Sequence, residues 1–274
     1  TLLIDSARRA IAEFNAQFVI FPELTLTSYP PEDLLLRPSL APRMKVAMDR
    51  ILAAKLPTTL VFGYPESSDG KLYNSLAVVD HGKLLATYRK QCLPNYQVFD
   101  ERRYFQAGNQ PCVLEIHGLR LGFTICEDLW EEMPTQQFEN QSLDLLLNIN
   151  ASPFHRGKAC ERRQLLKRRA QAIGAPIAYV NLVGGQDELV FDGGSLAVDS
   201  VGNAVVQAPQ FEAGLYPAVF KLSSSGCYEP ARVSCATQPS DLAQVYKALT
   251  IGVRDYVTKN GFKGVVLGLS GGID

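Results

Sequence analysis

The sequence predicts an α/β protein in which helices alternate with strands that pair in both directions. From residue 2 to residue 14, apolar side chains recur every three or four positions, as in an amphipathic helix, and an apolar strand pattern follows at residues 18–21. Two later pairs of strand patterns have His81-Gly82 and His117-Gly118 between them, dipeptides that suit tight hairpin turns. Hairpins make neighbouring strands antiparallel, so an all-parallel sheet is not expected.

The remaining elements continue this alternation. In chain order they are a helix at 40–56, a strand at 59–62, hairpin strands at 72–79 with 84–88 and at 113–116 with 119–125, a strand at 145–149, a helix at 158–173, and strands at 177–183, 195–199 and 204–207. The helix at 158–173 is rich in arginine and lysine. It also has an apolar stripe and no interleaved aromatic residue, which favours a solvated helix face over a nucleic-acid surface.

Composition excludes several broad classes of protein. The 274 residues are 46% hydrophobic and carry a net charge of −1, which is typical of a globular chain with one large domain or two and gives no basic face for nucleic acid. The apolar runs are too short to cross a bilayer, and the first residues lack a secretory pattern. The six cysteines form no C-x-x-C pair, so neither a zinc knuckle nor a disulfide scaffold is indicated, and a cytoplasmic setting is expected.

Cys126 is the first candidate for chemistry. It ends an alternating strand pattern at residues 121–125, and Glu127-Asp128 after it can begin a helix. Free backbone N–H groups and a helix dipole at such a junction favour the thiolate over the thiol. A free cysteine is more often a small buried hydrophobe, so Cys126 alone does not establish an active site.

Two other strand ends change that balance. Residues 19–24 lead to the carboxylate of Glu23, and residues 87–91 lead to the ammonium of Lys90. Together with Cys126 and the flanking residues, these segments resemble the nitrilase superfamily, whose catalytic residues are Glu, Lys and Cys in that chain order. The resemblance implies an α-β-β-α sandwich. Members of the superfamily begin with a strand of the central sheet, whereas this sequence begins with a helix, so a missing first strand is expected.

The resemblance also implies a division of chemical roles. Glu23 is expected to act as general base and acid, and Cys126 to attack a carboxamide and form a thioester. Lys90 and the backbone N–H of Glu127 are expected to stabilise the negative charge that develops on the carboxamide oxygen. Glu101 matches the second glutamate of the superfamily, which holds the catalytic lysine.

A longer set of segments resembles one branch of the superfamily, the glutaminase domains of the glutamine-dependent NAD synthetase family. The segments are residues 21–24, 28–34, 93–105, 125–128, 150–154 and 181–194. Positions that line the glutamine pocket in that family match Tyr29, Tyr96, Glu127, Trp130 and Ser152, and Lys158 is a further candidate donor. A free amino acid carries an ammonium and a carboxylate, so an anion such as Glu127 and a donor such as Ser152 suit it. The two tyrosines fit equally well as core or rim residues with satisfied hydroxyl groups.

The last segment predicts the start of a second domain. Residues 209–240 are loosely patterned, a helical pattern covers 242–257, and an apolar strand pattern at 265–269 runs into Ser270-Gly271-Gly272-Ile273-Asp274. This end resembles the pyrophosphate loop of N-type ATP pyrophosphatases, in which backbone N–H groups surround phosphate oxygens. A bare Ser-Gly-Gly is equally a flexible turn, but its place after an apolar strand favours the loop. The expected division is a nitrilase-like domain at 1–222, a linker at 223–240 and the truncated beginning of a synthetase domain at 241–274.

The resemblance therefore implies a glutamine amidotransferase that hydrolyses L-glutamine and supplies ammonia for the ATP-dependent amidation of deamido-NAD to NAD. ATP and Mg²⁺ are expected only in the complete synthetase domain, and the glutaminase part is expected to need no cofactor and no metal. By analogy with the superfamily, a homo-oligomer is expected, without nucleic-acid or membrane partners. Two alternatives remain open: a stand-alone amidase or carbamoylase with the same three residues, and a non-catalytic relative.

Overall fold

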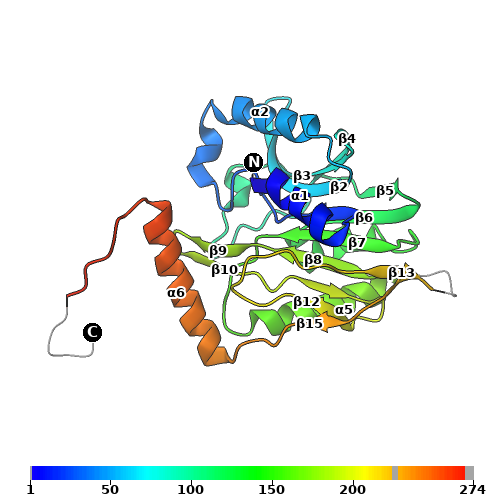
Figure 1. Ribbon diagram of the computed structural model, residues 1–274. Helices are drawn as coiled ribbons and strands as arrows, with labels where there is room; N and C mark the ends of the chain where they lie inside the picture. The colour runs from blue at the N-terminus through cyan, green and yellow to red at the C-terminus, as the bar shows by residue number, and fades with distance from the viewer. Residues whose placement is uncertain (1, 224–227, 269–274) are drawn as a thin grey trace.

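The computed structural model describes residues 2–223 and 228–268, and its two main β-sheets face each other between outer layers of helix (Figure 1). One sheet has four strands in the order β1-β2-β3-β4, and the other has seven in the order β15-β12-β11-β8-β7-β6-β5. Helices α1 (Leu2–Phe14) and α2 (Leu40–Ala53) cover the first sheet, and α5 (Lys158–Ile173) covers the second. The expected α-β-β-α sandwich is therefore confirmed.

The bounds of most elements agree with the predicted patterns to within a few residues at each end. The first sheet consists of β1 (Phe18–Ile20), β2 (Thr59–Ser68), β3 (Lys71–Asp80) and β4 (Lys83–Arg89). The second sheet consists of β5 (Cys112–Ile116), β6 (Leu119–Ile125), β7 (Leu145–Asn150), β8 (Ile177–Asn181), β11 (Leu196–Val198), β12 (Ala204–Gln207) and β15 (Ser234–Cys235). The other elements are two 3-10 helices (Glu32–Leu36 and Glu101–Arg103), α3 (Glu127–Trp130), α4 (Glu132–Gln136), β9 (Val183–Gln186), β10 (Leu189–Asp192), β13 (Phe220–Leu222), β14 (Tyr228–Pro230) and α6 (Asp241–Lys259).

The strands pair in both directions, as the sequence predicts. His81-Gly82 connects β3 to β4 and His117-Gly118 connects β5 to β6, and both pairs are antiparallel. In contrast, β6, β7 and β8 run parallel to one another, so that their carboxyl ends meet at one edge of the second sheet. This edge is where the cysteine at the end of β6 lies.

Apolar side chains fill the space between the layers. Val61 and Val78 of the first sheet and Phe123 of the second lie in the cluster between the sheets. Side chains alternate along a strand, so the neighbours Leu146 and Leu147 of β7 serve different layers. Leu147 belongs to the cluster between the sheets, and Leu146 to the cluster beneath α5. Among the described helices, none has the length and apolar character needed to span a membrane.

The strand predicted at 177–183 is divided in the structure. Strand β8 ends at Asn181, and after Leu182 the chain forms the hairpin β9–β10, which the sequence analysis did not predict. The side chain of Asn181 accepts a hydrogen bond from the backbone N–H of Ser152 and donates to the carbonyl of Gly193. The side chain of Asn181 thus bonds to the backbone at the point where a continuous strand would form backbone-to-backbone hydrogen bonds.

Helix α6 confirms the predicted C-terminal helix and packs on the β9–β10 hairpin through Ala248 and Ile251 (Figure 1). The loosely patterned stretch before it contains β13, β14 and β15, and β15 joins the second sheet parallel to β12. The strand predicted at 265–269 is wrong for residues 265–268, which are exposed and form no strand. An apolar strand needs a neighbour for its backbone hydrogen bonds, and no described strand pairs with this segment. The positions Ser270, Gly271, Gly272 and Asp274 lie outside the described residues.

Gly63 in β2 lies directly against the segment that carries Glu23. A Cβ atom at this position would lie 2.2 Å from the backbone nitrogen of Leu24 and 2.9 Å from the Cα atom of Glu23. Backbone atoms cannot move aside as a flexible side chain can, so we predict that Gly63→Ala lowers the free energy of unfolding by about 1–3 kcal/mol. Chemical denaturation measures the change. Gly264→Ala is the control, because a Cβ there meets nothing within 4 Å; equal stability of the two variants would contradict the close approach.

Candidate active site at the strand ends

Glu23, Lys90 and Cys126 lie together, each shortly beyond the end of a strand (β1, β4 and β6). The Nζ atom of Lys90 is 2.7 Å from Oε1 of Glu23, and the charges of both residues act on the Cys126 thiol. The segments that carry Cys126 and Glu23 are both hydrogen-bonded to β7. The backbone N–H of Cys126 donates to the carbonyl of Ile149 at 2.9 Å, and that of Glu23 donates to the carbonyl of Asn150 at 3.4 Å. The structure thus brings together the three residues predicted to be catalytic.

Lys90 is the centre of a buried ion cluster. Its Nζ atom lies 2.7 Å from Oε1 of Glu23 and 2.7 Å from Oε1 of Glu101, and all three side chains are almost fully buried. The side-chain amide of Asn74 donates to both carboxylates, at 2.7 Å to Glu23 and 3.3 Å to Glu101. The hydroxyl of Tyr29 donates to Glu101 at 2.9 Å. These bonds hold the ammonium and the two carboxylates in one arrangement.

The charges of the cluster follow from its burial. Burial alone would lower the pKa of Lys90, but Glu101 and Glu23 raise it well above its usual value, so the side chain is an ammonium. Burial raises the pKa of Glu101 to about 7, and the charge of Glu23 adds to this shift while Lys90 opposes it. Two carboxylates therefore compete for one cation, and the cluster can take up a proton near neutral pH.

Cys126 occupies a strained turn from β6 into α3. Its backbone has φ 45° and ψ −101°, a conformation that residues other than glycine rarely adopt. Burial raises the pKa of its thiol well above the usual value, Glu23 raises it further, and Lys90 opposes the shift. The expectation that this junction favours the thiolate is therefore wrong: α3 has only 4 residues, and burial outweighs the effect of so short a helix. Cys126 rests as a thiol and needs a base.

Asp128 joins the strand ends that carry Lys90 and Cys126. One carboxylate oxygen accepts the backbone N–H groups of Gln91 at 3.0 Å and Cys92 at 2.7 Å, next to Lys90. The other oxygen accepts the N–H of Ile125 at 3.1 Å, next to Cys126, and the hydroxyl of Tyr88 at 2.8 Å. The sequence analysis treated Asp128 only as the beginning of a helix. Its carboxylate was visible in the sequence, but three of its four partners, Tyr88, Gln91 and Cys92, lie on or just after β4 of the other sheet.

Four of the residues expected to line the glutamine pocket form two contacting pairs. Tyr96 donates to the carboxylate of Glu127 at 2.9 Å, and burial raises the pKa of Glu127 while this bond opposes the shift. The ammonium of Lys158 lies 3.8 Å from the centroid of the Trp130 ring, a cation–π contact. Tyr29 is buried and bound to Glu101, so it is a member of the ion cluster.

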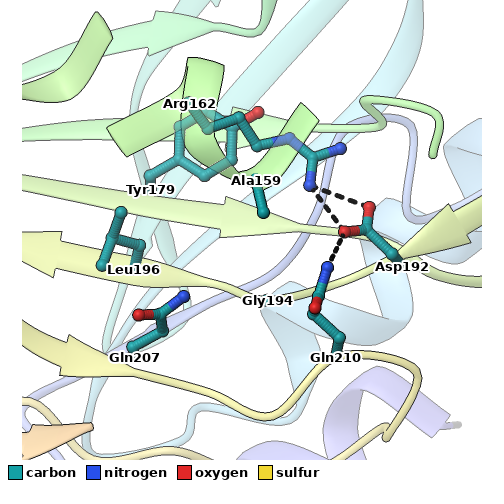
Figure 2. A pocket seen from close by; sticks show the side chains of 8 residues that line it. All are labelled: Ala159, Arg162, Tyr179, Asp192, Gly194, Leu196, Gln207 and Gln210. Atoms are coloured by element: carbon teal, nitrogen blue, oxygen red, sulfur yellow. Dashed lines mark hydrogen bonds and ion pairs between the residues drawn. The ribbon is translucent and has the colours of Figure 1, made fainter. Parts of the chain in front are cut away.

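Ser152, the last residue of the expected pocket, is held by a buried ion pair that the sequence analysis missed. Arg162 lies 2.8 and 2.9 Å from the two oxygens of Asp192, and Gln210 donates to the same carboxylate at 2.8 Å (Figure 2). Arg162 also donates to the carbonyl of Ser152 at 2.8 Å. The interpretation of the charged helix as a solvated face is therefore wrong for Arg162, although Arg163, Lys167 and Arg168 are exposed as expected.

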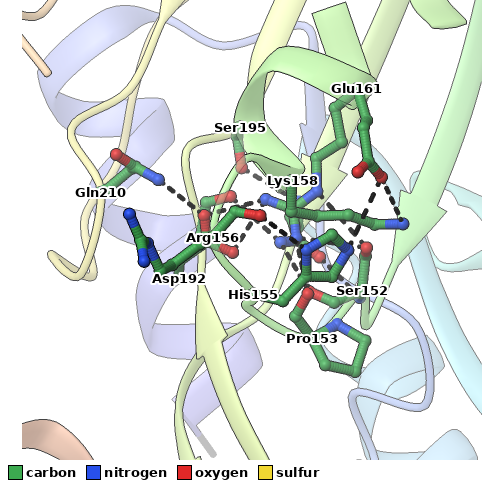
Figure 3. Close-up of polar contacts among 12 residues, drawn as sticks. Ser152, Pro153, His155, Arg156, Lys158, Glu161, Asp192, Ser195 and Gln210 are labelled. Carbon is green, nitrogen blue, oxygen red and sulfur yellow. Dashed lines mark hydrogen bonds and ion pairs between the residues drawn. The ribbon is translucent and has the colours of Figure 1, made fainter. Parts of the chain in front are cut away.

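The Arg162–Asp192 ion pair also helps to hold Glu23 in place. Arg162 fixes the backbone of Ser152, and the N–H of the preceding residue, Ala151, donates to Oε2 of Glu23 at 2.9 Å. Figure 3 labels Ser152 and also Lys158, whose ammonium lies 3.4 Å from Glu161. The small cavity next to Arg162 is lined by eight residues, none of which is a predicted catalytic residue (Figure 2). Arg162 thus acts on Glu23 through the chain, by way of Ser152 and Ala151.

Comparison with known proteins identifies the class that this fold and site define. The family model for carbon-nitrogen hydrolase matches residues 2–227, and the chain belongs to that family. An amidase from Nesterenkonia sp. AN1, described as a member of the nitrilase superfamily, has a TM-score of 0.70 and 28% identity over 78% of this chain and 81% of its own.

The particular likeness is to glutamine-dependent NAD(+) synthetases. The synthetase of Xylella fastidiosa (strain 9a5c) is 44% identical over 99% of this chain and 50% of its own length, and that of Acinetobacter baylyi is 40% identical over the same shares. The structure of the Acinetobacter baumannii enzyme in complex with ADP has a TM-score of 0.93 and 42% identity, covering 99% of this chain and 51% of that one. The chain thus spans about half the length of these relatives. A second family model, NAD synthase, matches residues 245–274.

The raised pKa of Glu101 predicts a pH dependence of stability. Its value in the fold is about 7, above the ordinary 4.5, so its contribution to stability is complete below about pH 4.5 and is lost as the pH rises through 7. We predict that stability falls between pH 5 and pH 8 more steeply in the parent protein than in Glu101→Gln, which cannot ionise there. Denaturation curves at several pH values measure the slopes. The exposed Glu139→Gln should keep the parent slope, and identical slopes for all three proteins would contradict the prediction.

Proposed function

We propose that this chain is the glutamine-hydrolysing part of a glutamine-dependent NAD synthetase, and that it releases ammonia from L-glutamine for the ATP-dependent amidation of deamido-NAD to NAD. The observation that carries the proposal is the buried ammonium of Lys90, held 2.7 Å from both Glu23 and Glu101 next to the Cys126 thiol. Strongly perturbed ionisable groups that share one site are characteristic of catalytic centres.

Glu23 is the base in this proposal. Of the charged groups that raise the pKa of Cys126, Glu23 has the largest effect, followed by Glu127 and Glu101. Glu23 takes the thiol proton as the sulfur attacks the carboxamide carbon of glutamine. The same proton then passes to the nitrogen of the collapsing intermediate, which leaves as ammonia and gives a thioester. Water, activated by Glu23, hydrolyses the thioester to glutamate and restores the thiol.

Lys90 and the backbone N–H of Glu127 stabilise the oxyanion formed in both halves of this reaction. Lys90 is charged at all relevant pH values, and no described residue accepts a hydrogen bond from the N–H of Glu127. Glu101 does not contact the substrate in this scheme. Its bonds from Lys90 and Tyr29 keep the ammonium in position.

The glutamine pocket is proposed to lie around Glu127. Its carboxylate, buried and bound by Tyr96, suits the α-ammonium of an amino acid. Trp130, Tyr29 and Ser152 would line the remaining walls. Lys158, 3.8 Å above the Trp130 ring, would face the α-carboxylate.

The synthetase half of the proposal rests on the C-terminal residues. We assign 1–222 to the glutaminase domain, 223–240 to the linker and 241–274 to the synthetase domain, with Ser270, Gly271, Gly272 and Asp274 in the pyrophosphate loop for ATP and its Mg²⁺. A homo-oligomer in the cytoplasm fits this assignment. A stand-alone amidase is the second candidate, and the likeness to the Nesterenkonia amidase supports it. The match of residues 245–274 to NAD synthase favours the synthetase.

Cys126→Ala tests the central step. We predict that it lowers glutamine hydrolysis at least about a thousandfold, because the covalent step is lost. Glutamate release measures activity, and circular dichroism checks the fold. Cys160→Ala, at an exposed thiol, is the control and should retain activity. Turnover by Cys126→Ala would refute the assignment, and a parent protein that cleaves simple amides but not glutamine would favour the amidase.

Glu127→Gln tests the selectivity for an amino acid. A charge-assisted contact with the α-ammonium contributes about 1.5–3 kcal/mol, so we predict a KM for glutamine roughly 10- to 150-fold higher. The KM for an aliphatic amide, which lacks the ammonium, should change much less. Steady-state kinetics with both substrates gives the ratio, and equal losses would exclude the ammonium contact.

A further inference from the structure

The two His-Gly turns, which take no part in the proposed chemistry, meet at the other end of the sandwich. Nδ1 of His81 lies 3.0 Å from Oδ1 of Asp80, and Nε2 of His117 lies 3.2 Å from the same oxygen. The two imidazole rings are 6.0 Å apart in an edge-to-face arrangement. One turn belongs to the first sheet and the other to the second, so both sheets supply a histidine to one carboxylate.

This cluster is separate from the candidate active site. Asp80 ends β3, whereas Asn74, which bonds to Glu23 and Glu101, lies six positions earlier on the same strand. Six residues of extended strand span about 20 Å. The histidines therefore do not reach the catalytic ion cluster.

Both turns use an unusual residue. His81 has φ 48° and His117 has φ 53°, each followed by a glycine with φ 79°. Asn-Gly and Asp-Gly are the pairs that best suit such hairpin turns, because asparagine and aspartate tolerate positive φ. Histidine also tolerates positive φ better than most residues, so the backbone alone does not distinguish these turns. What distinguishes them is that both histidines lie against one carboxylate, which points to a role for the side chains.

The hydrogen bonds of the cluster are crowded onto one atom. Besides the two imidazoles, the hydroxyl of Thr59 donates to Oδ1 of Asp80 at 2.7 Å. Nε2 of His117 also lies 3.2 Å from the Thr59 hydroxyl, so three polar groups crowd one of the two carboxylate oxygens. A cation placed between the imidazole nitrogens and the carboxylate would replace these competing bonds.

We propose that Asp80, His81 and His117 bind a divalent transition-metal ion such as Zn²⁺. Imidazole and carboxylate are common zinc ligands, and ligand atoms about 2.0–2.1 Å from a tetrahedral ion are about 3.3 Å from each other. The observed 3.0 and 3.2 Å are close to that separation, and all three ligand atoms lie within 4.8 Å of one another.

The surroundings of the three side chains suit such a site. The hydroxyl of Thr59 orients the carboxylate, as outer partners of metal ligands do. The side chains of His81 and His117 are 54% and 36% exposed, so an ion can enter from solvent and keep water at a fourth position. Because the ligands come from both sheets, the ion would join them at the end opposite the catalytic residues.

The test is zinc binding by the metal-free protein. Calorimetry and equilibrium dialysis with Zn²⁺ alone should give one strong site per chain, and saturation should raise the melting temperature. His81→Asn and His117→Asn should each weaken binding at least about a hundredfold, because a ligand is lost, whereas Thr59→Val should weaken it about tenfold. Since Asn-Gly suits these turns, the asparagine variants should melt no lower than the parent without metal, which separates loss of a ligand from loss of the fold.

His155→Asn is the matched control, since the chain has only 3 histidines and His155 is exposed and outside the cluster. It should bind Zn²⁺ like the parent. Cobalt(II) in place of zinc distinguishes the cluster from the cysteines, because nitrogen and oxygen ligands give no sulfur-to-metal charge-transfer band. Absence of binding at about 100 µM Zn²⁺, well above the dissociation constants of built zinc sites, would overturn the proposal. So would parent-like binding by His81→Asn and His117→Asn, or a cobalt spectrum dominated by thiolate.

Discussion

One ammonium shared by two buried carboxylates is the interaction on which the rest of this site depends. Removing Lys90, Glu23 and Glu101 from water costs several kcal/mol for each ion, and a well-packed apolar group of the same volume would often be as stable. Stability alone therefore does not account for the cluster. The cluster does explain why the Cys126 thiol is protonated at rest, because a low-dielectric pocket with an excess of negative charge disfavours a further anion. In the proposed reaction, Glu23, one of the carboxylates that suppress the thiolate, accepts the proton of the thiol.

The cluster keeps its geometry because the backbone beneath it is held from several directions. Asp128 accepts N–H groups next to both Lys90 and Cys126, so one carboxylate sets the separation between the Lys90 ammonium and the Cys126 thiol. Gly63 lets the segment of Glu23 approach β2 closely, and Ala151 donates to the other oxygen of that glutamate. Arg162, which is paired with Asp192, donates a hydrogen bond to the carbonyl of Ser152 and so holds the neighbouring Ala151 in position. Precise placement here comes from side chains that never contact substrate.

Strand β3 connects the two functional ends of the molecule. Near its start, Asn74 bridges the carboxylates of Glu23 and Glu101, and at its end Asp80 meets both histidine turns. The sheets are joined by buried apolar side chains in between, so polar groups that cross from one sheet to the other concentrate at the two ends. At one end the crossing bonds run from Asp128 to the residues after β4 and from Ala151 to Glu23, and at the other they form the proposed metal site.

The sequence by itself determined the periodic elements, the three catalytic candidates and their chain order. The exact helix at 158–173 and both hairpin turns follow from local spacing, because periodicity records which face of an element is apolar. Tertiary structure alone decided what each polar side chain meets. In the tertiary structure Arg162 is buried although it lies in a charged run, and the raised pKa of Cys126 keeps its thiol protonated. Strand β8 ends at Asn181, and His81 lies beside His117. These outcomes depend on partners supplied by distant segments, and burial and electrostatic shifts have no counterpart in a one-dimensional pattern.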